Sequence, residues 1–199
     1  MPDTGAPWNI PYVDSTDLVS DWPTDSLALA NAIDAGLDVA NNAGIGTNVV
    51  QTVKTDTFST TSTSFTDITG LAVTITPTSA TAKVLLIAQV AWGATAAVSA
   101  GFGLQITGGN AGTYIGDAGT GQSRVIFQSY AQATYEFDRS LESMVAVYLD
   151  SPATTSATTY QLQTYTGAGT AYVNRSGDDL ASSSFGRGAS SITAIEVAA

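Results

Sequence analysis

The stretch VLLIAQVAW, residues 84–92, is the longest strongly apolar run of the chain, and it decides the fold class. Such a run is far too short to span a bilayer, which takes about 20 apolar residues as a helix. It is rich in large aliphatic residues, and the turn cluster TPTSATA (76–82) precedes it, a pattern typical of a buried strand. We therefore expect residues 84–92 to form the most buried strand of a β-sheet.

Apolar and polar residues alternate with a period of two from Val49 onward, as they do in strands. The segment 123–137 places these residues on one face: Val125, Phe127, Ala131, Ala133, Tyr135 and Phe137. The segment 140–150 predicts Leu141, Val145, Val147 and Leu149 inward, with Glu142 and Asp150 outward. Further strands are predicted at 49–58, 64–76, 83–92, 100–107, 112–116, 158–166, 170–175 and 190–197.

About eight to ten strands at this spacing, with no helix pattern between them, predict a mainly β fold over residues 49–199. The expected architecture is an antiparallel β-sandwich, jelly-roll-like in its connections. Only 12% of the residues are charged, so few lysines are available to protect the sheet edges. This favours association into a closed oligomer.

The acidic segment before the sandwich carries the chain's helix signals. Asp21 or Thr24 can cap a helix, Pro23 suits its first turn, and Gly44 can end it. We predict a helix at 23–42, within a helix-and-hinge region at 23–48. Its a/d seam would consist of Ala30, Ile33, Leu37 and Ala40. Two alternatives remain open: the stripe packs on the chain's own β domain, or it forms a helix bundle between subunits.

Residues 1–22 are expected to form an extended attachment arm. Pro7 and Pro11 oppose both helix and central strand. Between and beside them, Trp8, Ile10 and Tyr12 are large apolar side chains that need a surface supplied by another molecule. The predicted anchors of the arm are Pro7, Trp8, Ile10, Pro11 and Tyr12. No Lys or Arg precedes Lys54, so we expect no secretion signal and assembly in the cytoplasm of the cell that makes the protein.

Composition excludes several functions. The net charge of −11 would repel phosphate backbones, so we expect no nucleic-acid binding. The sequence contains no cysteine and no histidine, which rules out disulfides, the common catalytic triads and thiolate or imidazole metal sites. We therefore expect no cofactor and no metal. Because the apolar run at 84–92 is too short to span a bilayer, we also expect no membrane insertion.

Few residues remain as candidates for chemistry. Glu136 and Asp138 lie two apart and would share a strand face, where a carboxylate pair could cleave a glycoside; the alternative is a solvated strand end paired with Arg139. Asp178 and Asp179 could bind calcium, although the EF-hand spacing is missing. Three tyrosines could stack on sugars: Tyr130, Tyr165 and Tyr172. We expect a protein that is not an enzyme.

Four segments resemble structural proteins of tailed bacteriophages. FTDITGLAVTITPTSATAKVLLIAQV (65–90), YLDSPATTSATTYQLQTY (148–165) and SSITAIEVAA (190–199) are similar to a β-sandwich module of tail fibres, minor tail proteins and capsid-decorating fibres. GAPWNIPYVDSTDLVSDWP (5–23) is similar to the N-terminal segment of phage minor tail or fibre proteins. The resemblance implies a homotrimeric virion component with an N-terminal attachment segment, and it transfers no catalytic residue.

The expected function is therefore structural. The arm would bind other virion proteins of the tail, baseplate or capsid, the helix would organise a trimer, and the sandwich would contact a host surface receptor or glycan. One alternative is a capsid-decorating head fibre that stabilises the shell. The other is a small polysaccharide depolymerase acting through Glu136 and Asp138. A bacterial surface adhesin is disfavoured by the missing export signal.

Overall fold

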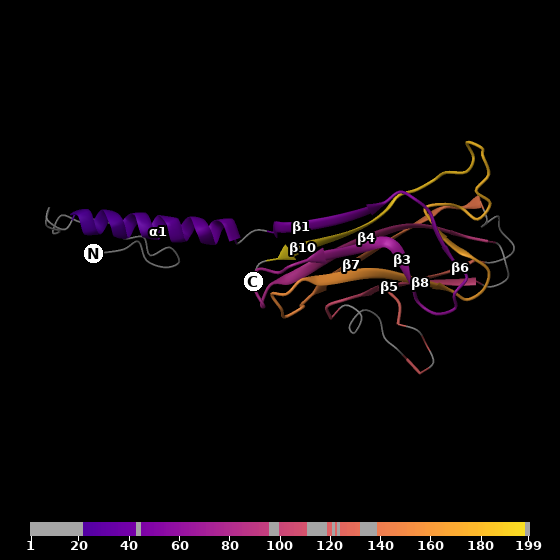
Figure 1. Cartoon of the computed structure of the whole chain (residues 1–199), viewed down its shortest axis with the longest axis horizontal. Coiled ribbons are helices and arrows are strands. Elements are labelled where there is room, and N and C mark those ends of the chain that lie inside the picture. The colour runs from indigo at the N-terminus through magenta and orange to yellow at the C-terminus, as the bar shows by residue number, and fades with distance from the viewer. Residues whose placement is uncertain are drawn as a thin grey trace. The chain divides into compact units, whose positions relative to one another are not determined.

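A computed structural model describes residues 22–42, 45–95, 100–110, 119–120, 122, 124–131 and 139–197 (Figure 1). The chain divides into two compact units between Thr47 and Asn48. Helix α1 (Trp22–Asn42) belongs to the first unit and matches the predicted helix at 23–42. The strands are β1 (Ile45–Lys54), β2 (Phe58–Thr60), β3 (Thr66–Ile75), β4 (Lys83–Ala94), β5 (Ala100–Thr107), β6 (Phe127–Ala131), β7 (Glu142–Asp150), β8 (Thr158–Thr166), β9 (Ala171–Val173) and β10 (Ser190–Val197).

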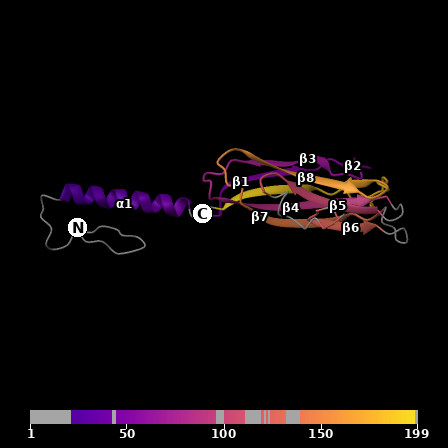
Figure 2. The same ribbon diagram turned by 90° about the horizontal axis from the view of Figure 1, so that it is seen from below.

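The strands form two antiparallel sheets, as the period-two pattern predicts. One sheet has the order β1-β10-β4-β9-β2, with β7 on the other side of β4, and the second has the order β3-β8-β5-β6. Figure 2 shows the strands running along the length of the second unit. Strand β1 begins at Ile45, four residues before the predicted start at Val49, so the predicted hinge is strand from that residue onward. The predicted strand at 112–116 lies outside the described residues.

The strand pairs are nested, which is the connectivity of a jelly roll. β1 pairs with β10, β3 with β8, β4 with β7, and β5 with β6. The pairs β4–β10 and β5–β8 then join these hairpins into the two sheets. A long hairpin rolled up in this way gives eight strands in two packed sheets. The predicted mainly β, jelly-roll-like sandwich is confirmed.

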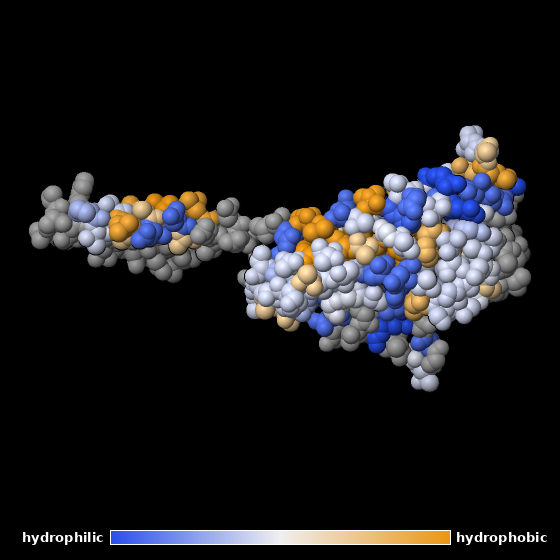
Figure 3. Space-filling view, viewed as in Figure 1, coloured by the Kyte–Doolittle hydropathy of each residue, from blue (hydrophilic) through white to orange (hydrophobic). Residues whose placement is uncertain are grey.

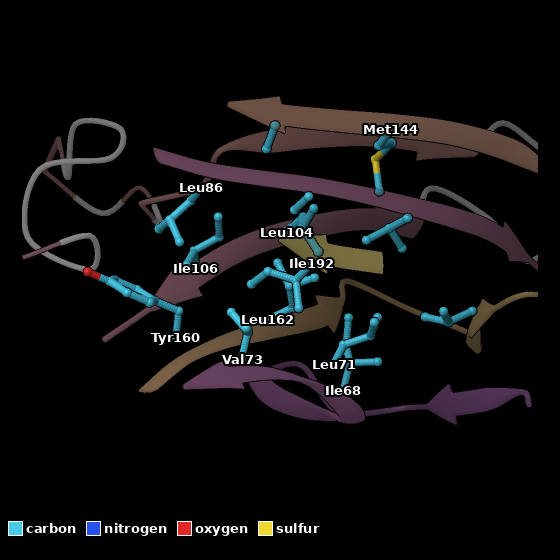
Figure 4. Packing of buried hydrophobic residues seen from close by; sticks show 14 of the residues in the cluster. Ile68, Leu71, Val73, Leu86, Leu104, Ile106, Met144, Tyr160, Leu162 and Ile192 are labelled. Atoms are coloured by element: carbon cyan, nitrogen blue, oxygen red, sulfur yellow. The ribbon is translucent and has the colours of Figure 1, made fainter. Parts of the chain in front are cut away.

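The core lies between the two sheets and is almost entirely apolar. In β4, Val84, Leu86, Ala88, Val90 and Trp92 are all at most 1% exposed, because this strand has neighbours on both edges and the second sheet over its inner face. Figure 4 shows buried side chains that converge from both sheets. Among the labelled ones are Leu86, Ile192 and Met144 of the first sheet and Val73, Leu104, Ile106, Tyr160 and Leu162 of the second.

The predicted orientation of β7 is wrong. Val145, Val147 and Leu149 were expected inward, but they are 62%, 64% and 45% exposed. The inward side chains are instead those at 142, 144, 146, 148 and 150. Both faces of this strand carry apolar side chains, and the prediction assigned the larger branched ones to the core. In the structure, the small side chain of Ala146 packs inside and the larger branched residues face outward.

Asp150 was expected outward, yet it is fully buried. One of its oxygens, Oδ2, accepts hydrogen bonds from the Tyr160 hydroxyl (2.6 Å) and the Asn110 backbone N–H (3.2 Å). These donors replace part of the lost hydration of the carboxylate. Burial, together with the bond to Asp150, raises the pKa of Tyr160, so this phenol keeps its proton as a donor.

The predicted strand at 123–137 is described only in part. Strand β6 covers Phe127–Ala131, and the Phe127 side chain, expected on the core face, is 37% exposed. Of the other residues assigned to that face, Val125 is half-buried and precedes the strand. Ala133, Tyr135 and Phe137 lie outside the described residues, and the side chain of Ala131 is not described. Leu141 is half-buried just before β7, and Glu142 is half-buried at its start.

A buried carboxylate connects the first and last strands of the second unit. Glu196 of β10 is 1% exposed. Its Oε1 accepts hydrogen bonds from the Thr78 backbone N–H (2.8 Å) and hydroxyl, and its Oε2 accepts one from the Asn48 side-chain amide (3.1 Å). Asn48 also donates to the Thr76 carbonyl at 2.9 Å. Strand β1, strand β10 and the turn before β4 are thereby joined at one point.

The protonation state of Glu196 should control part of the stability. Burial by itself raises the pKa of Glu196, but the hydrogen bonds from Thr78 and Asn48 outweigh it, so the pKa lies below the ordinary value of 4.5. A depressed carboxylate pKa adds stability above the unfolded-state value, and this stability disappears as the pH falls through the folded-state value. Glu196→Gln should lower the free energy of unfolding at pH 7 by about 1–3 kcal/mol.

The measurement is denaturant unfolding of both proteins at pH 7 and at a pH low enough to protonate wild-type Glu196, which lies below its ordinary pKa of 4.5. The difference between wild type and Glu196→Gln should shrink at the lower pH, because both side chains are then neutral. Thr78→Val, which removes one donor and keeps the shape, should also reduce the pH-dependent difference. A difference that stays the same at both pH values would contradict this role of Glu196.

Candidate functional site

Residues 1–21 of the predicted arm and the predicted carboxylate pair lie outside the described residues, and Trp22, the last residue assigned to the arm, is the first residue of α1. The residues outside include the anchors Pro7, Trp8, Ile10, Pro11 and Tyr12, together with Glu136 and Asp138. All of these stay predictions. The described chain has three notable surfaces: the stripe on α1, a loop cluster of arginines and aspartates, and the outer face of one sheet.

The predicted seam of α1 exposes its large apolar side chains. Ile33 and Leu37 are 46% and 60% exposed, Ala30 is exposed, and the side chain of Ala40 is not described. Leu27, which lies off the predicted seam, is also 61% exposed. A single helix cannot bury such a stripe by itself. The stripe is therefore available for packing, and both predicted occupants of it remain open.

The loop cluster is built on a buried asparagine that follows β9. Asn174 has a φ of +66° and is fully buried; asparagine tolerates this left-handed conformation better than most residues. Its side-chain amide donates to the carbonyls of Lys54 (2.8 Å) and Asp56 (2.9 Å), and its side-chain oxygen accepts from the Ser190 hydroxyl (2.6 Å). These bonds fix the start of the 174–189 loop against β1 and β10.

Asp179 is the centre of the charged part of this loop. Arg187 donates two hydrogen bonds to it, from Nε to Oδ1 (2.7 Å) and from one terminal nitrogen to Oδ2 (2.6 Å). Arg175 donates a third to Oδ2 at 3.2 Å. The guanidinium of Arg175 also lies 3.9 Å from the centre of the Tyr172 ring, a cation–π contact. Bidentate pairing and stacking give this loop a defined shape.

Two further ion pairs lie in the same part of the fold. Arg139 is 3.6 Å from Asp178, and Lys54 is 2.8 Å from Asp56. The hydrogen bond from Lys54 lowers the pKa of Asp56, which is exposed. The cations of this region are thus paired with carboxylates, although the chain has a net charge of −11. The described surface here presents paired charges and a tyrosine ring.

The calcium interpretation of Asp178 and Asp179 finds no support in this geometry, because arginines occupy both carboxylates. In the described part of the chain, no group of three or more potential ligand residues could hold a metal ion. Tyr165 packs edge-on against Phe65, with ring centres 5.0 Å apart, and Tyr172 carries Arg175. Tyr130 lies in β6, and its side chain is not described.

Sequence reasoning missed the loop cluster as a unit. Arg175, Asp179 and Arg187 come together because the chain turns back at Asn174 and Asp179, which both have positive φ. Only the asparagine and the paired aspartates signalled such a turn in the sequence.

The helix described here is not long and apolar enough to cross a membrane.

No family of known proteins matches this sequence, and no curated protein matches it. Eleven chains of solved structures match. One belongs to the structure of infectious bursal disease virus, Gx strain: it is 16% identical with a TM-score of 0.32, and the match covers 77% of this chain and 39% of that chain. At this TM-score, the likeness to a chain of a virus structure carries no argument about function.

Loss of the Asp179 charge should open the arginine loop. Asp179→Asn keeps the size and tolerates the positive φ of 45°, but it weakens the bonds to both arginines. Trypsin cleavage after Arg187 in the folded protein should become faster by about tenfold, since cleavage follows local opening. The measurement is the cleavage rate by mass spectrometry.

The matched control is Asp67→Asn, which removes an exposed carboxylate of β3 outside the loop. It should leave the cleavage rate after Arg187 unchanged, and both variants should keep the far-ultraviolet circular dichroism of the wild type. An unchanged cleavage rate in Asp179→Asn would show that the ion pairs do not hold this loop.

Proposed function

We propose that this protein is a non-enzymatic structural component of a tailed phage virion, a trimeric fibre or minor tail protein. In this proposal, residues 1–22 attach it to other virion proteins of the tail, baseplate or capsid. The helix assembles the subunits, and the sandwich is displayed for adhesion to a host receptor or glycan.

The observation that carries the proposal is the jelly roll that follows a separate N-terminal unit. Double-sheet jelly rolls are the architecture of viral capsid domains, lectins and cupins. This sequence contains no histidine and therefore no imidazole ligand for a metal. The proposal follows the capsid and lectin uses of the architecture. This step is an analogy between folds, and the phage-like segments 65–90 and 148–165 support it independently.

The exposed stripe on α1 supports subunit assembly. Ile33 and Leu37, its two large side chains, are both more than two-fifths exposed. Packing of such a stripe against copies of the same helix would bury these side chains with coiled-coil geometry. A trimer also places three copies of the arm side by side, so that weak attachment of each arm adds up to firm attachment.

The described carboxylates support a role without catalysis. Asp150, Glu196 and Asp179 are each held by hydrogen bonds from the protein itself, so each has a structural task. A depolymerase would have to use Glu136 and Asp138. If polysaccharide cleavage is observed and disappears in Glu136→Gln, the enzyme interpretation replaces ours.

Removal of the arm tests attachment. A protein lacking residues 1–22 should keep the number of subunits of the full-length oligomer in light scattering, because all of the helix after Trp22 remains. It should fail to join particles when it replaces the wild type during infection. A fivefold substitution of Pro7, Trp8, Ile10, Pro11 and Tyr12 by Ser should have the same effect. Normal incorporation of either protein would refute the arm.

Adhesion separates the two structural roles. The oligomer should bind host cells or purified envelope glycan, and the loop variant Asp179→Asn should bind less if the arginine loop is the contact. Absence of binding, together with infectious virions that lack the protein, would favour capsid decoration. Binding by an unrelated acidic jelly roll of equal charge would show that the adhesion is not specific.

A further inference from the structure

The outward side chains of β1, β10, β4 and β7 form a continuous surface, which we name the apolar face. Alternation and register assign its members: Val49, Gln51 and Val53 of β1; Ser191, Thr193, Ile195 and Val197 of β10; Lys83, Leu85, Ile87 and Gln89 of β4; and Ser143, Val145, Val147 and Leu149 of β7. Lys83, at one end, is the one charged residue among them. Figure 3 shows hydrophobic atoms gathered over β1, β10 and β4.

The apolar members lie next to one another across the strands. One row runs from Leu149 through Leu85 to Ile195, and the next runs from Val147 through Ile87 to Thr193. The Gln51 side chain donates a hydrogen bond to the Thr193 hydroxyl at 2.9 Å, which places the outward residues of β1 beside this second row. Val49 and Val53 are 53% and 54% exposed, so the surface reaches the β1 edge of the sheet.

The second sheet shows what a water-facing surface of this protein looks like. Its outward residues are mainly threonine, glutamine and aspartate: Asp67 and Thr74 of β3, Thr159, Gln161 and Gln163 of β8, and Gln105 and Thr107 of β5. They pair with one another, as in the Thr74–Thr159 contact at 2.7 Å and the Gln163–Asp67 bond at 2.6 Å. The two outer faces of one sandwich therefore differ in kind. The apolar face has the composition of a surface that another molecule covers.

Its size fits one part of a subunit interface. Four strands spaced by about 4.8 Å and about seven residues long cover roughly 400 Å² in projection, which is in the range of patches that mark protein contacts. A stable interface buries about 800 Å² on each partner. The apolar face alone is too small, and the stripe on α1 supplies further area on the same chain.

A second copy of this chain is the occupant that the charges and the connectivity favour. Symmetric contacts bring like residues close together, and with a net charge of −11 most acidic surfaces of two copies would repel each other. The apolar face has no carboxylate. Only residues 43–44 separate α1 from β1, a reach of about 10 Å. Copies joined through α1 would therefore start their β1 strands, the edge of the apolar face, close together.

We propose that the apolar face of each copy packs against neighbouring copies around the axis of the oligomer. The proposal rests on the self-assembly part of the proposed function and names the surface that performs it. Val145, Val147 and Leu149, which are exposed in a single chain, then become the second core of the assembly. The Thr- and Gln-rich sheet faces water.

A single introduced thiol tests this in the full-length protein, because the natural sequence has no cysteine. Val147→Cys reports on the apolar face, and Thr159→Cys, on the opposite sheet, is the matched control. In the folded oligomer, a maleimide reagent should label Val147→Cys at least about tenfold more slowly than Thr159→Cys, since access requires opening of the interface. In urea, the two rates should be equal.

A second pair of variants tests the energetics. Val147→Asp should lower the oligomer mass in light scattering, because three buried charges would face one another, whereas Thr159→Asp should leave the mass unchanged. Equal labelling of the two thiols, an unchanged mass in Val147→Asp, or a wild-type mass of one 20.3 kDa chain would overturn the inference. If the protein joins particles normally but the two thiols are labelled equally, only the packing of the apolar face is refuted. If the thiol of Val147→Cys is protected but the protein fails to join particles, only the virion role is refuted.

Discussion

The pairing of β1 with β10 is the constraint on which the rest of the fold depends. It joins the first and last strands of the sandwich, and one of its hydrogen bonds, between Asn48 and Glu196, spans 148 residues of sequence. The hairpins nested inside it form from closer segments, yet the first sheet is complete only when the ends meet. Joining β1 to β10 through the buried carboxylate of Glu196 costs desolvation free energy. It also enforces register, because any shift of β10 would leave Glu196 without Thr78 and Asn48.

The two ends of the sandwich use polar groups differently. Around Glu196, hydroxyl and amide donors surround one charge, so the connection between β1 and β10 depends on hydrogen bonds. Around Asp179, guanidinium groups and a tyrosine ring hold a long loop in a shape that its own backbone does not favour, with positive φ at Asn174 and Asp179. The first arrangement stabilises the fold. The second maintains the shape of a surface loop.

Local patterns predicted local structure well, and contacts between distant segments poorly. The helix at 23–42 and the strands at 83–92, 158–166 and 190–197 appear close to their predicted bounds, because period and turn residues are properties of neighbouring positions. The arginine loop could not be predicted, since Arg175, Asp179 and Arg187 meet only through two left-handed residues. Asp178 and Asp179 therefore resembled a calcium site, although their charges are used by arginines.

The wrong prediction for the orientation of β7 has a physical cause. A strand with water on one face alternates clearly, whereas a strand covered on both faces is apolar throughout. In β7, Met144 and Ala146 face the core while Val145 and Val147 face outward, and in the run VLLIAQVAW both Leu86 and its neighbour Ile87 are apolar. Orientation was ambiguous because both sides of these strands carry apolar side chains. Apolar residues on both faces of β7 prevented prediction of the face that points to the core. The same pattern is expected if the outer face packs against another copy, as we propose.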